Sequence, residues 1–177
     1  TLPPDFDPSH RYPVLIYVYG GPHAQVVANQ WAGARGLWPQ MMAARGLIIW
    51  SLDNRGTGGR GHAWEAPVYR SLGKQELADQ LAGVAYLKGL PFVDASRIGI
   101  WGWSYGGYMT LYSLLNSPDT FRAGVAVAPV TDWKDYDTIY TERYMDRPVD
   151  NPDGYKESAP LLKAASLRVP LLLVHGS

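Results

Sequence analysis

Cysteine is missing from this sequence of 177 residues, and no Asn-x-Ser/Thr glycosylation site occurs in it. The lack of cysteine excludes disulfides, zinc–thiolate sites and a cysteine nucleophile. Net charge is also lacking, since 16 Lys and Arg balance 16 Asp and Glu. No global field therefore recruits nucleic acid or an anionic membrane surface. No stretch approaches about 18 consecutive apolar residues, so we expect no membrane segment in this chain.

The composition that remains is that of one globular domain. Hydrophobic residues make up 46% of the chain and charged residues 18%, which fits a fold with a hydrophobic core rather than a disordered tail. The first residue is Thr, and no charged-then-apolar signal segment follows it. At the other end, residues 169–177 read as a buried strand that enters a turn. We therefore expect a piece of a longer protein, cut on both sides.

Five apolar runs of strand length predict the strands of a sheet. None of them alternates cleanly between apolar and polar residues, and continuous apolar runs are typical of strands covered on both faces, as in parallel sheets. The runs are 13–19, 47–52, 97–103, 123–127 and 171–174.

Helical patterns lie between these runs. An apolar stripe over residues 77–85, with Leu77, Leu81, Val84 and Ala85 on one face, predicts an amphipathic helix that ends near Gly89. Residues 105–115 are mostly apolar and predict a buried helix, whereas residues 29–45 give a weaker pattern that Pro39 interrupts. Strands separated by helices predict an α/β fold with a mainly parallel, doubly wound sheet.

One motif carries chemistry. Residues 102–106 read G-W-S-Y-G and match G-x-S-x-G, with a predicted strand before them and a predicted helix after them. That context is the one required of a nucleophile elbow. Gly102 and Gly106 meet the need for small residues in so tight a turn, and Gly107 allows the new helix to pack closely. We favour Ser104 as a nucleophile over an ordinary serine in a glycine-rich turn.

A nucleophilic serine also needs an oxyanion hole. The backbone N–H of Tyr105, the residue after the nucleophile, is one expected donor, and the second usually comes from the loop after an earlier strand. In this sequence that loop is residues 19–22. The second oxyanion donor is either a backbone N–H of Gly20 or Gly21 or the hydroxyl of Tyr19, and the sequence leaves both alternatives open.

A second glycine motif is a decoy. Residues 56–61 match G-x-G-x-x-G, and Glu76 lies 20 residues after Gly56, as in a dinucleotide-binding fingerprint. Such a fingerprint must open directly into a helix, but residues 62–67 show no helical stripe and end in a proline. We therefore expect a glycine-rich surface loop and no cofactor.

The general base is harder to find. In α/β-hydrolases the order along the chain is Ser, then Asp or Glu, then His, and only His175 follows Ser104. His175 ends a strand in a His-Gly turn, so a hydrogen-bonding role is favoured over catalysis. Asp132, Asp135 and Asp137 are interpreted as capping or surface carboxylates.

The order of these segments resembles a known family. Nearly the whole chain is similar to the catalytic domain of the prolyl oligopeptidase family, in its dipeptidyl peptidase IV branch. The stretches W-G-W-S-Y-G-G-Y and Y-T-E-R-Y-M are far more specific than G-x-S-x-G. The matching segments are 17–22, 53–56, 101–108, 127–133, 140–145 and 173–176.

The resemblance implies an α/β-hydrolase fold and a serine exopeptidase that removes N-terminal dipeptides with Pro or Ala in the second position. It implies that Ser104 is the nucleophile and that the Tyr19 hydroxyl lines the oxyanion hole. It also implies an apolar pocket for the proline ring, to which Tyr105 contributes. The spacing of the aromatic members alone fits simple helix packing instead. The pocket residues are Val130, Trp133, Tyr136 and Tyr140.

Departures from the family limit what we expect of this chain. The resemblance places the triad Asp and His beyond Ser177, and nothing here resembles the β-propeller that binds the free amine of the peptide substrate. We therefore expect residues 1–177 to be a partial hydrolase domain, inactive alone because triad members are missing. Family members are often homodimers. Another hydrolase activity (oligopeptidase, acylaminoacyl peptidase or esterase) or a non-catalytic binding module remain alternatives.

Overall fold

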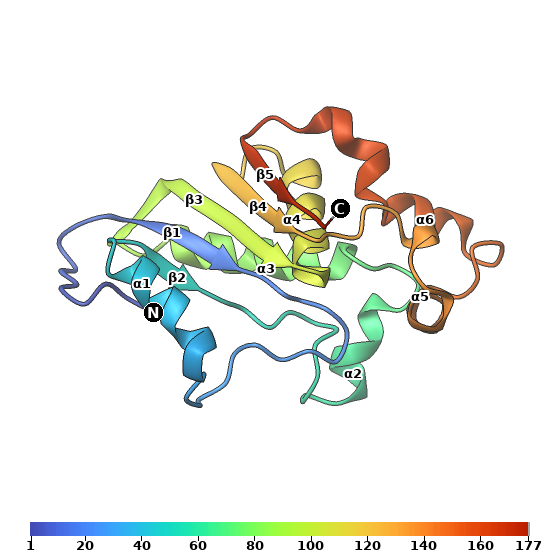
Figure 1. The fold of residues 1–177 in the computed structure, drawn as a ribbon, viewed down its shortest axis with the longest axis horizontal. Coiled ribbons are helices and arrows are strands. Elements are labelled where there is room, and N and C mark those ends of the chain that lie inside the picture. Colours follow the sequence, from blue (N-terminus) through green and yellow to red (C-terminus); the bar gives the residue numbers. More distant parts are fainter. Residues whose placement is uncertain (177) are drawn as a thin grey trace.

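The computed structural model describes residues 1–176, which fold around a five-stranded sheet (Figure 1). The strand order is β2-β1-β3-β4-β5, and every neighbouring pair is parallel. The predicted parallel α/β architecture is therefore confirmed. The strands are β1 Tyr12–Tyr17, β2 Ile48–Trp50, β3 Val93–Trp103, β4 Ala123–Val127 and β5 Leu171–Val174.

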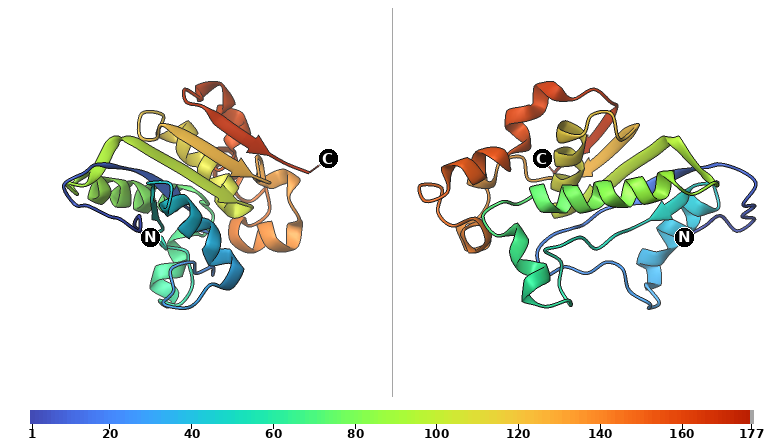
Figure 2. Two further views of the ribbon diagram at one scale, coloured as in Figure 1. Left: turned by 60° about the vertical axis from the view of Figure 1, so that its left-hand side comes forward. Right: turned by 180° about the vertical axis from the view of Figure 1, so that it is seen from behind.

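The described residues between the strands form helices on both faces of the sheet. Helices α3 and α4 cover one face, and α1 lies on the opposite face, as Figures 1 and 2 show. The sheet is thus doubly wound. The helices are α1 Leu37–Ala43, α2 His62–Glu65, α3 Lys74–Lys88, α4 Tyr105–Asn116, α5 Thr138–Met145 and α6 Pro152–Glu157, with 3-10 turns η1 Gly33–Gly36, η2 Ala66–Val68, η3 Trp133–Asp135 and η4 Pro160–Ser166.

Strand register gathers the chemistry-bearing segments at one edge. Trp103, the last residue of β3, pairs with Val127, the last residue of β4, and Val127 pairs with Val174 of β5. Because parallel strands end together, the loops that follow them share the carboxyl edge of the sheet, where such sheets place their ligands. Helices α2, α5 and α6 lie beyond this edge (Figure 1).

The core lies between the sheet and helices α3 and α4. Val14 and Ile16 of β1 alternate inward and are at most 2% exposed. Ile98 and Ile100 of β3 do the same. Each such side chain contributes about 1.5–3 kcal/mol through burial. Helix α4 is buried from Tyr105 to Leu115, which confirms the predicted buried helix.

Three predictions about helices were wrong. Ala85, expected on the apolar face of α3, is exposed. Pro39 does not interrupt a helix, because it is the third residue of α1 and lies in the first turn, where no intrahelical N–H is lost. Residues 62–67, expected to show no helix, hold the single turn of α2 and the start of η2.

Nothing in residues 1–176 forms a helix long and apolar enough to cross a membrane.

The last strand also differs from its prediction. A buried strand was expected over residues 171–174, but Leu172 and Leu173 are 58% and 54% exposed. The reason is topological, because β5 is an edge strand that pairs only with β4 among the described residues. Leu172 and Leu173 point to opposite faces of the sheet, and at this edge the described residues leave both faces largely uncovered.

Candidate active site

Ser104 stands on the turn that joins β3 to α4. Its φ is 57° and its ψ is −121°, a conformation that costs strain in any residue other than glycine. The Ser104 N–H donates to the Val127 carbonyl at 2.8 Å, and the Ser104 carbonyl accepts from the Tyr108 N–H at 3.0 Å. The predicted strand–turn–helix context is confirmed, and the surrounding backbone holds the strained serine in place.

Glycines make this turn sterically possible. A Cβ on Gly102 or on Gly106 would collide with the carbonyl oxygen of Val18, which follows β1. A Cβ on Gly107 would come within 2.6 Å of the Val127 carbonyl oxygen. The sequence prediction that these three positions exclude side chains therefore holds, and it holds because the elbow touches the ends of both neighbouring strands.

The expected oxyanion donors flank Ser104. Tyr105 is the first residue of α4, so its N–H has no partner within the helix and lies at the positive end of the helix dipole. The ring of Tyr19 lies 5.3 Å from the Trp103 ring and 6.5 Å from the Tyr105 ring. Both residues therefore border the elbow. The choice between the Tyr19 hydroxyl and the Gly20–Gly21 backbone stays a prediction.

The expected proline pocket is a cluster of aromatic rings beside the elbow. Trp133, only 1% exposed, lies 5.5 Å from the Tyr105 ring. The Tyr136 and Tyr140 rings lie 5.8 and 5.9 Å from that of Trp133. Half-buried Val130 also packs on the core. The rings meet without sharing one helix, because Trp133 is in η3 and Tyr140 in α5. The three residues therefore do not share one helix face, and their role as a proline pocket stays a prediction.

The candidate acids and the late histidine have other surroundings. Asp132 caps η3 by accepting from the Lys134 N–H, and Asp137 caps α5 by accepting from the Tyr140 N–H. The capping interpretation is confirmed for both, and Asp135 is exposed. His175 is exposed, with Nδ1 3.0 Å from the Gly176 carbonyl oxygen. None of the ion pairs in the described part of the chain includes it.

One carboxyl at the site was missed by sequence reasoning. The Tyr105 hydroxyl donates to Glu76 Oε1 at 2.6 Å, and the Glu76 side chain is fully buried. Burial raises the pKa of Glu76 to about 7, although the hydrogen bond from Tyr105 opposes the rise. The signal was available, because a buried tyrosine next to the nucleophile needs a partner for its hydroxyl.

The second glycine motif has a structural explanation. Gly56, Gly59 and Gly61 have φ between 83° and 96°, which few other residues tolerate. The Gly56 carbonyl accepts from the His23 N–H at 3.0 Å, so the loop supports the segment after β1. Glu76 of the same motif faces Tyr105 instead. Residues 1–176 hold no group of three or more acidic or histidine side chains placed to bind a metal ion.

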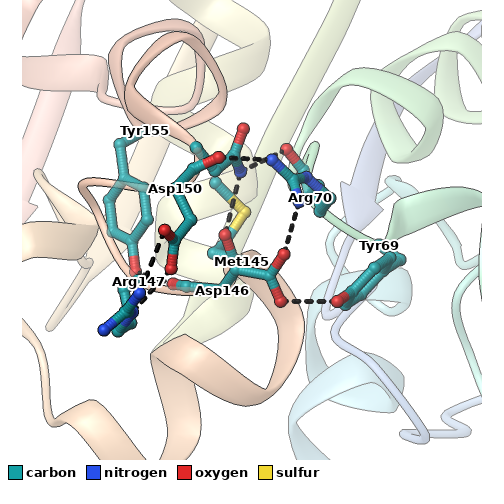
Figure 3. A network of polar contacts seen from close by, with 8 residues as sticks. Tyr69, Arg70, Met145, Asp146, Arg147, Asp150 and Tyr155 are labelled. Carbon is teal, nitrogen blue, oxygen red and sulfur yellow. Dashed lines mark hydrogen bonds and ion pairs between the residues drawn. The ribbon is translucent and has the colours of Figure 1, made fainter.

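A polar network fixes the end of α5 (Figure 3). Arg70 Nη1 donates to Asp146 Oδ2 at 2.6 Å, and the Tyr69 hydroxyl donates to Asp146 Oδ1. Asn151 Nδ2 donates to the carbonyls of Arg70 and Met145, at 2.9 Å each. Because α5 carries Tyr140, this network ties one wall of the aromatic cluster to the segment that precedes α3.

Comparisons with known proteins agree with this geometry. The model of the prolyl oligopeptidase family matches residues 35–177. Dipeptidyl-aminopeptidase B of Aspergillus niger is 42% identical over 177 residues, and prolyl endopeptidase FAP of Homo sapiens is 43% identical over 180 residues. The crystal structure of Porphyromonas gingivalis dipeptidyl peptidase 4 is 48% identical, with a TM-score of 0.94. All three cover 99% of this chain.

This chain spans only part of each relative. It covers 19% of the Aspergillus protein, 23% of the human protein and 24% of the Porphyromonas chain. At this identity and TM-score the predicted α/β-hydrolase fold is confirmed.

Proposed function

Because the chain belongs to the prolyl oligopeptidase family, we propose that it supplies the nucleophile and proline pocket of a serine peptidase that releases N-terminal dipeptides. The observation that carries the proposal is the strained elbow at Ser104, held between two strand ends beside a buried aromatic cluster. The relatives named dipeptidyl peptidases support the substrate class.

The chemistry follows from the geometry of the elbow. The Ser104 Oγ attacks the carbonyl carbon of the second peptide residue, and its proton passes to a general base. The negative oxygen of the tetrahedral intermediate is stabilised by the Tyr105 N–H and the Tyr19 hydroxyl, aided by the positive end of α4. Collapse expels the shortened peptide as an amine and leaves an acyl-enzyme on Ser104. Water then attacks the ester, which releases the dipeptide and restores the serine.

The general base is assigned to another part of the protein. His175 is exposed and makes no described ion pair, and the relatives are four to five times longer than this chain. Residues 1–177 alone are therefore expected to be inactive, because an unassisted serine hydroxyl is a weak nucleophile. The acidic anchor for the free amine of the substrate is assigned outside this chain as well.

The aromatic cluster supports the proposed preference for proline. A proline ring has no N–H to recognise, so selectivity must come from apolar shape and ring faces. Trp133 and Tyr140 stack nearly parallel, with an interplanar angle of 20°, and Tyr136 meets both edge-on. This cluster supplies flat, rigid surfaces of the size of a pyrrolidine ring. Alanine fits the same space with fewer contacts.

A panel of chromogenic substrates on the full-length protein tests this proposal. Gly-Pro and Ala-Ala substrates with a free N-terminus are expected to be cleaved, and Ser104→Ala abolishes both activities. An N-blocked Gly-Pro substrate tests the second candidate, a post-proline endopeptidase, which the human relative's name favours. Cleavage of simple esters alone would overturn the peptidase assignment. The Ser113→Ala variant, within α4, controls for loss of a serine hydroxyl.

A further inference from the structure

Helix α3 places two buried polar side chains one turn apart, Glu76 and Gln80, both with 0% exposure. Polar groups are rarely buried so completely without a specific partner. We propose that both are positioning residues that hold the two halves of the oxyanion hole, Glu76 through Tyr105 and Gln80 through Asn54 and Gly20. The proposal rests on the proposed function, since it names the residues that support the same site.

The first half is the helix side of the elbow. Glu76 Oε1 accepts the Tyr105 hydroxyl at 2.6 Å, and Tyr105 is only 3% exposed. This bond anchors the ring of the residue whose N–H is the first expected oxyanion donor. Ser104, next to Tyr105, has a strained φ of 57°. A fixed Tyr105 ring therefore limits the directions in which the strained turn can relax.

The second half is the loop after β1. Gln80 Nε2 donates to Asn54 Oδ1 at 3.0 Å and to the Leu52 carbonyl at 3.2 Å. Asn54, 1% exposed, in turn donates from Nδ2 to the Gly20 carbonyl at 3.0 Å. Gly20 follows Tyr19 directly and has a φ of 75°. These hydrogen bonds, from Gln80 to Asn54 and from Asn54 to Gly20, therefore fix the backbone next to Tyr19, which carries the second expected oxyanion donor.

The two halves of the oxyanion hole pack against each other at Gly21, in the loop after β1. A Cβ on Gly21 would lie 3.0 Å from Tyr105 Cγ and 3.1 Å from Tyr19 Cε1, so both rings pack directly against this loop. A shift of either the Tyr105 ring or the Gly20–Gly21 backbone would therefore disturb the other. Helix α3 thus acts as one rigid support for donors that come from two different strands.

Incomplete hydrogen bonding argues against a purely structural role. Glu76 Oε2 and Gln80 Oε1 are buried and have no hydrogen-bond partner among the residues that the structure describes. None of the ion pairs among the described residues includes Glu76. A partly satisfied buried polar group costs stability, so core packing alone does not account for these two side chains. Their presence is explained if the bonds they do make serve the reaction.

The experiment measures steady-state kinetics of the full-length protein with a Gly-Pro substrate. Glu76→Ala and Gln80→Leu are each expected to lower kcat by about 10- to 100-fold, the cost of a slightly misplaced catalytic group, with KM nearly unchanged. Glu76→Gln restores most of the activity, because its amide oxygen still accepts the Tyr105 hydroxyl. Glu76→Ala combined with Tyr105→Phe is expected to be no worse than the poorer single variant.

The controls separate the possible failures. Ser113→Ala removes another buried hydroxyl from α4 without touching this network and is expected to behave like wild type. A folded Glu76→Ala variant with wild-type kcat overturns the proposal for Glu76. If that variant does not fold, Tyr105→Phe removes the same bond conservatively, and a wild-type kcat there overturns it equally. A wild-type protein without any Ser104-dependent activity would instead refute the proposed function.

Discussion

Replacing Glu76 with glutamine is expected to change how the stability of this domain depends on pH. Glu76 is fully buried, and its pKa is raised by burial from the ordinary value of 4.5 to about 7. The negative charge of Asp79 also raises this pKa, whereas the hydrogen bond from the Tyr105 hydroxyl lowers it. The folded state therefore holds the proton more tightly than the unfolded state does.

The magnitude follows from the two pKa values. A rise from 4.5 to about 7 corresponds to about 3 kcal/mol, at about 1.4 kcal/mol per pKa unit. Below pH 4.5 the carboxyl is protonated in both states, so its stabilising effect is fully present. Between pH 4.5 and about 7 only the unfolded state loses its proton, and the free energy of unfolding falls as the pH rises. Above that range the whole contribution is lost.

Urea unfolding of the full-length protein, followed by tryptophan fluorescence, measures this effect. The difference in unfolding free energy between wild type and Glu76→Gln is the quantity to follow. The contributions of all other titrating groups are the same in both proteins and cancel in this difference. The variant is expected to gain about 3 kcal/mol over wild type between about pH 4 and about pH 8. Glu157→Gln removes an exposed carboxyl from α6 and is expected to show no such trend.

Two parallel pH profiles would refute the reasoning. If wild type and Glu76→Gln lose or gain stability together across this range, Glu76 has the same proton affinity in the folded and unfolded states. A difference of the opposite sign would mean that the ionised carboxylate is stabilised by a partner outside the described residues.

Three further substitutions test the site and its supports. Gly106→Ala is expected to lower the free energy of unfolding by about 3 kcal/mol or more and to abolish labelling of Ser104, because its Cβ collides with the Val18 carbonyl oxygen. Gly99→Ala on β3 is the control, since its Cβ makes only ordinary contacts. A folded Gly106→Ala protein that is still labelled would contradict this. Trp133→Ala is expected to lower the free energy of unfolding by about 4 kcal/mol, because it opens a cavity, and to raise KM for Gly-Pro substrates. The same KM in wild type and variant would exclude Trp133 from the pocket. Arg70→Ala is expected to cost only about 1 kcal/mol in thermal unfolding, because its ion pair with Asp146 is half-exposed; a larger loss would show that the network is cooperative.

Apolar runs in the sequence placed the strands well. The predicted limits 123–127 and 171–174 coincide with β4 and β5, and β2 and β3 begin or end within four residues of their predicted limits. Length and β-branched content were sufficient because these runs are bounded by glycine, proline or polar turns. The exposure of β5 was not predictable in the same way, since a residue pattern does not show which strand lies at an edge.

Helix α3 shows where periodicity fails. Its buried face includes Leu77 and Val84, as the apolar stripe predicts, but also the polar residues Glu76 and Gln80, while Ala85 faces solvent. A hydrophobic pattern cannot assign buried polar side chains, because their burial depends on partners from distant segments. Tyr105 and Asn54, which supply those partners, lie 29 and 26 residues away along the chain.

The elbow was the most predictable part of the site. Ser104 and its glycines were found because the turn imposes local steric limits that a short motif records. The aromatic cluster was different, since Trp133, Tyr136 and Tyr140 have a spacing that fits one helix and yet occupy η3, a turn and α5. Asp137 caps α5 at that break. Only the family resemblance pointed to a pocket there.

Labelling of Ser104 in the full-length protein tests the central claim most directly. Intact-mass spectrometry before and after treatment with a fluorophosphonate is expected to show one adduct, mapped to Ser104 and absent from Ser104→Ala. That result would show that a base in the remaining protein activates the strained serine of this elbow. A folded full-length protein that forms no adduct, or forms it on another residue, would contradict the account and leave a binding module on a hydrolase fold.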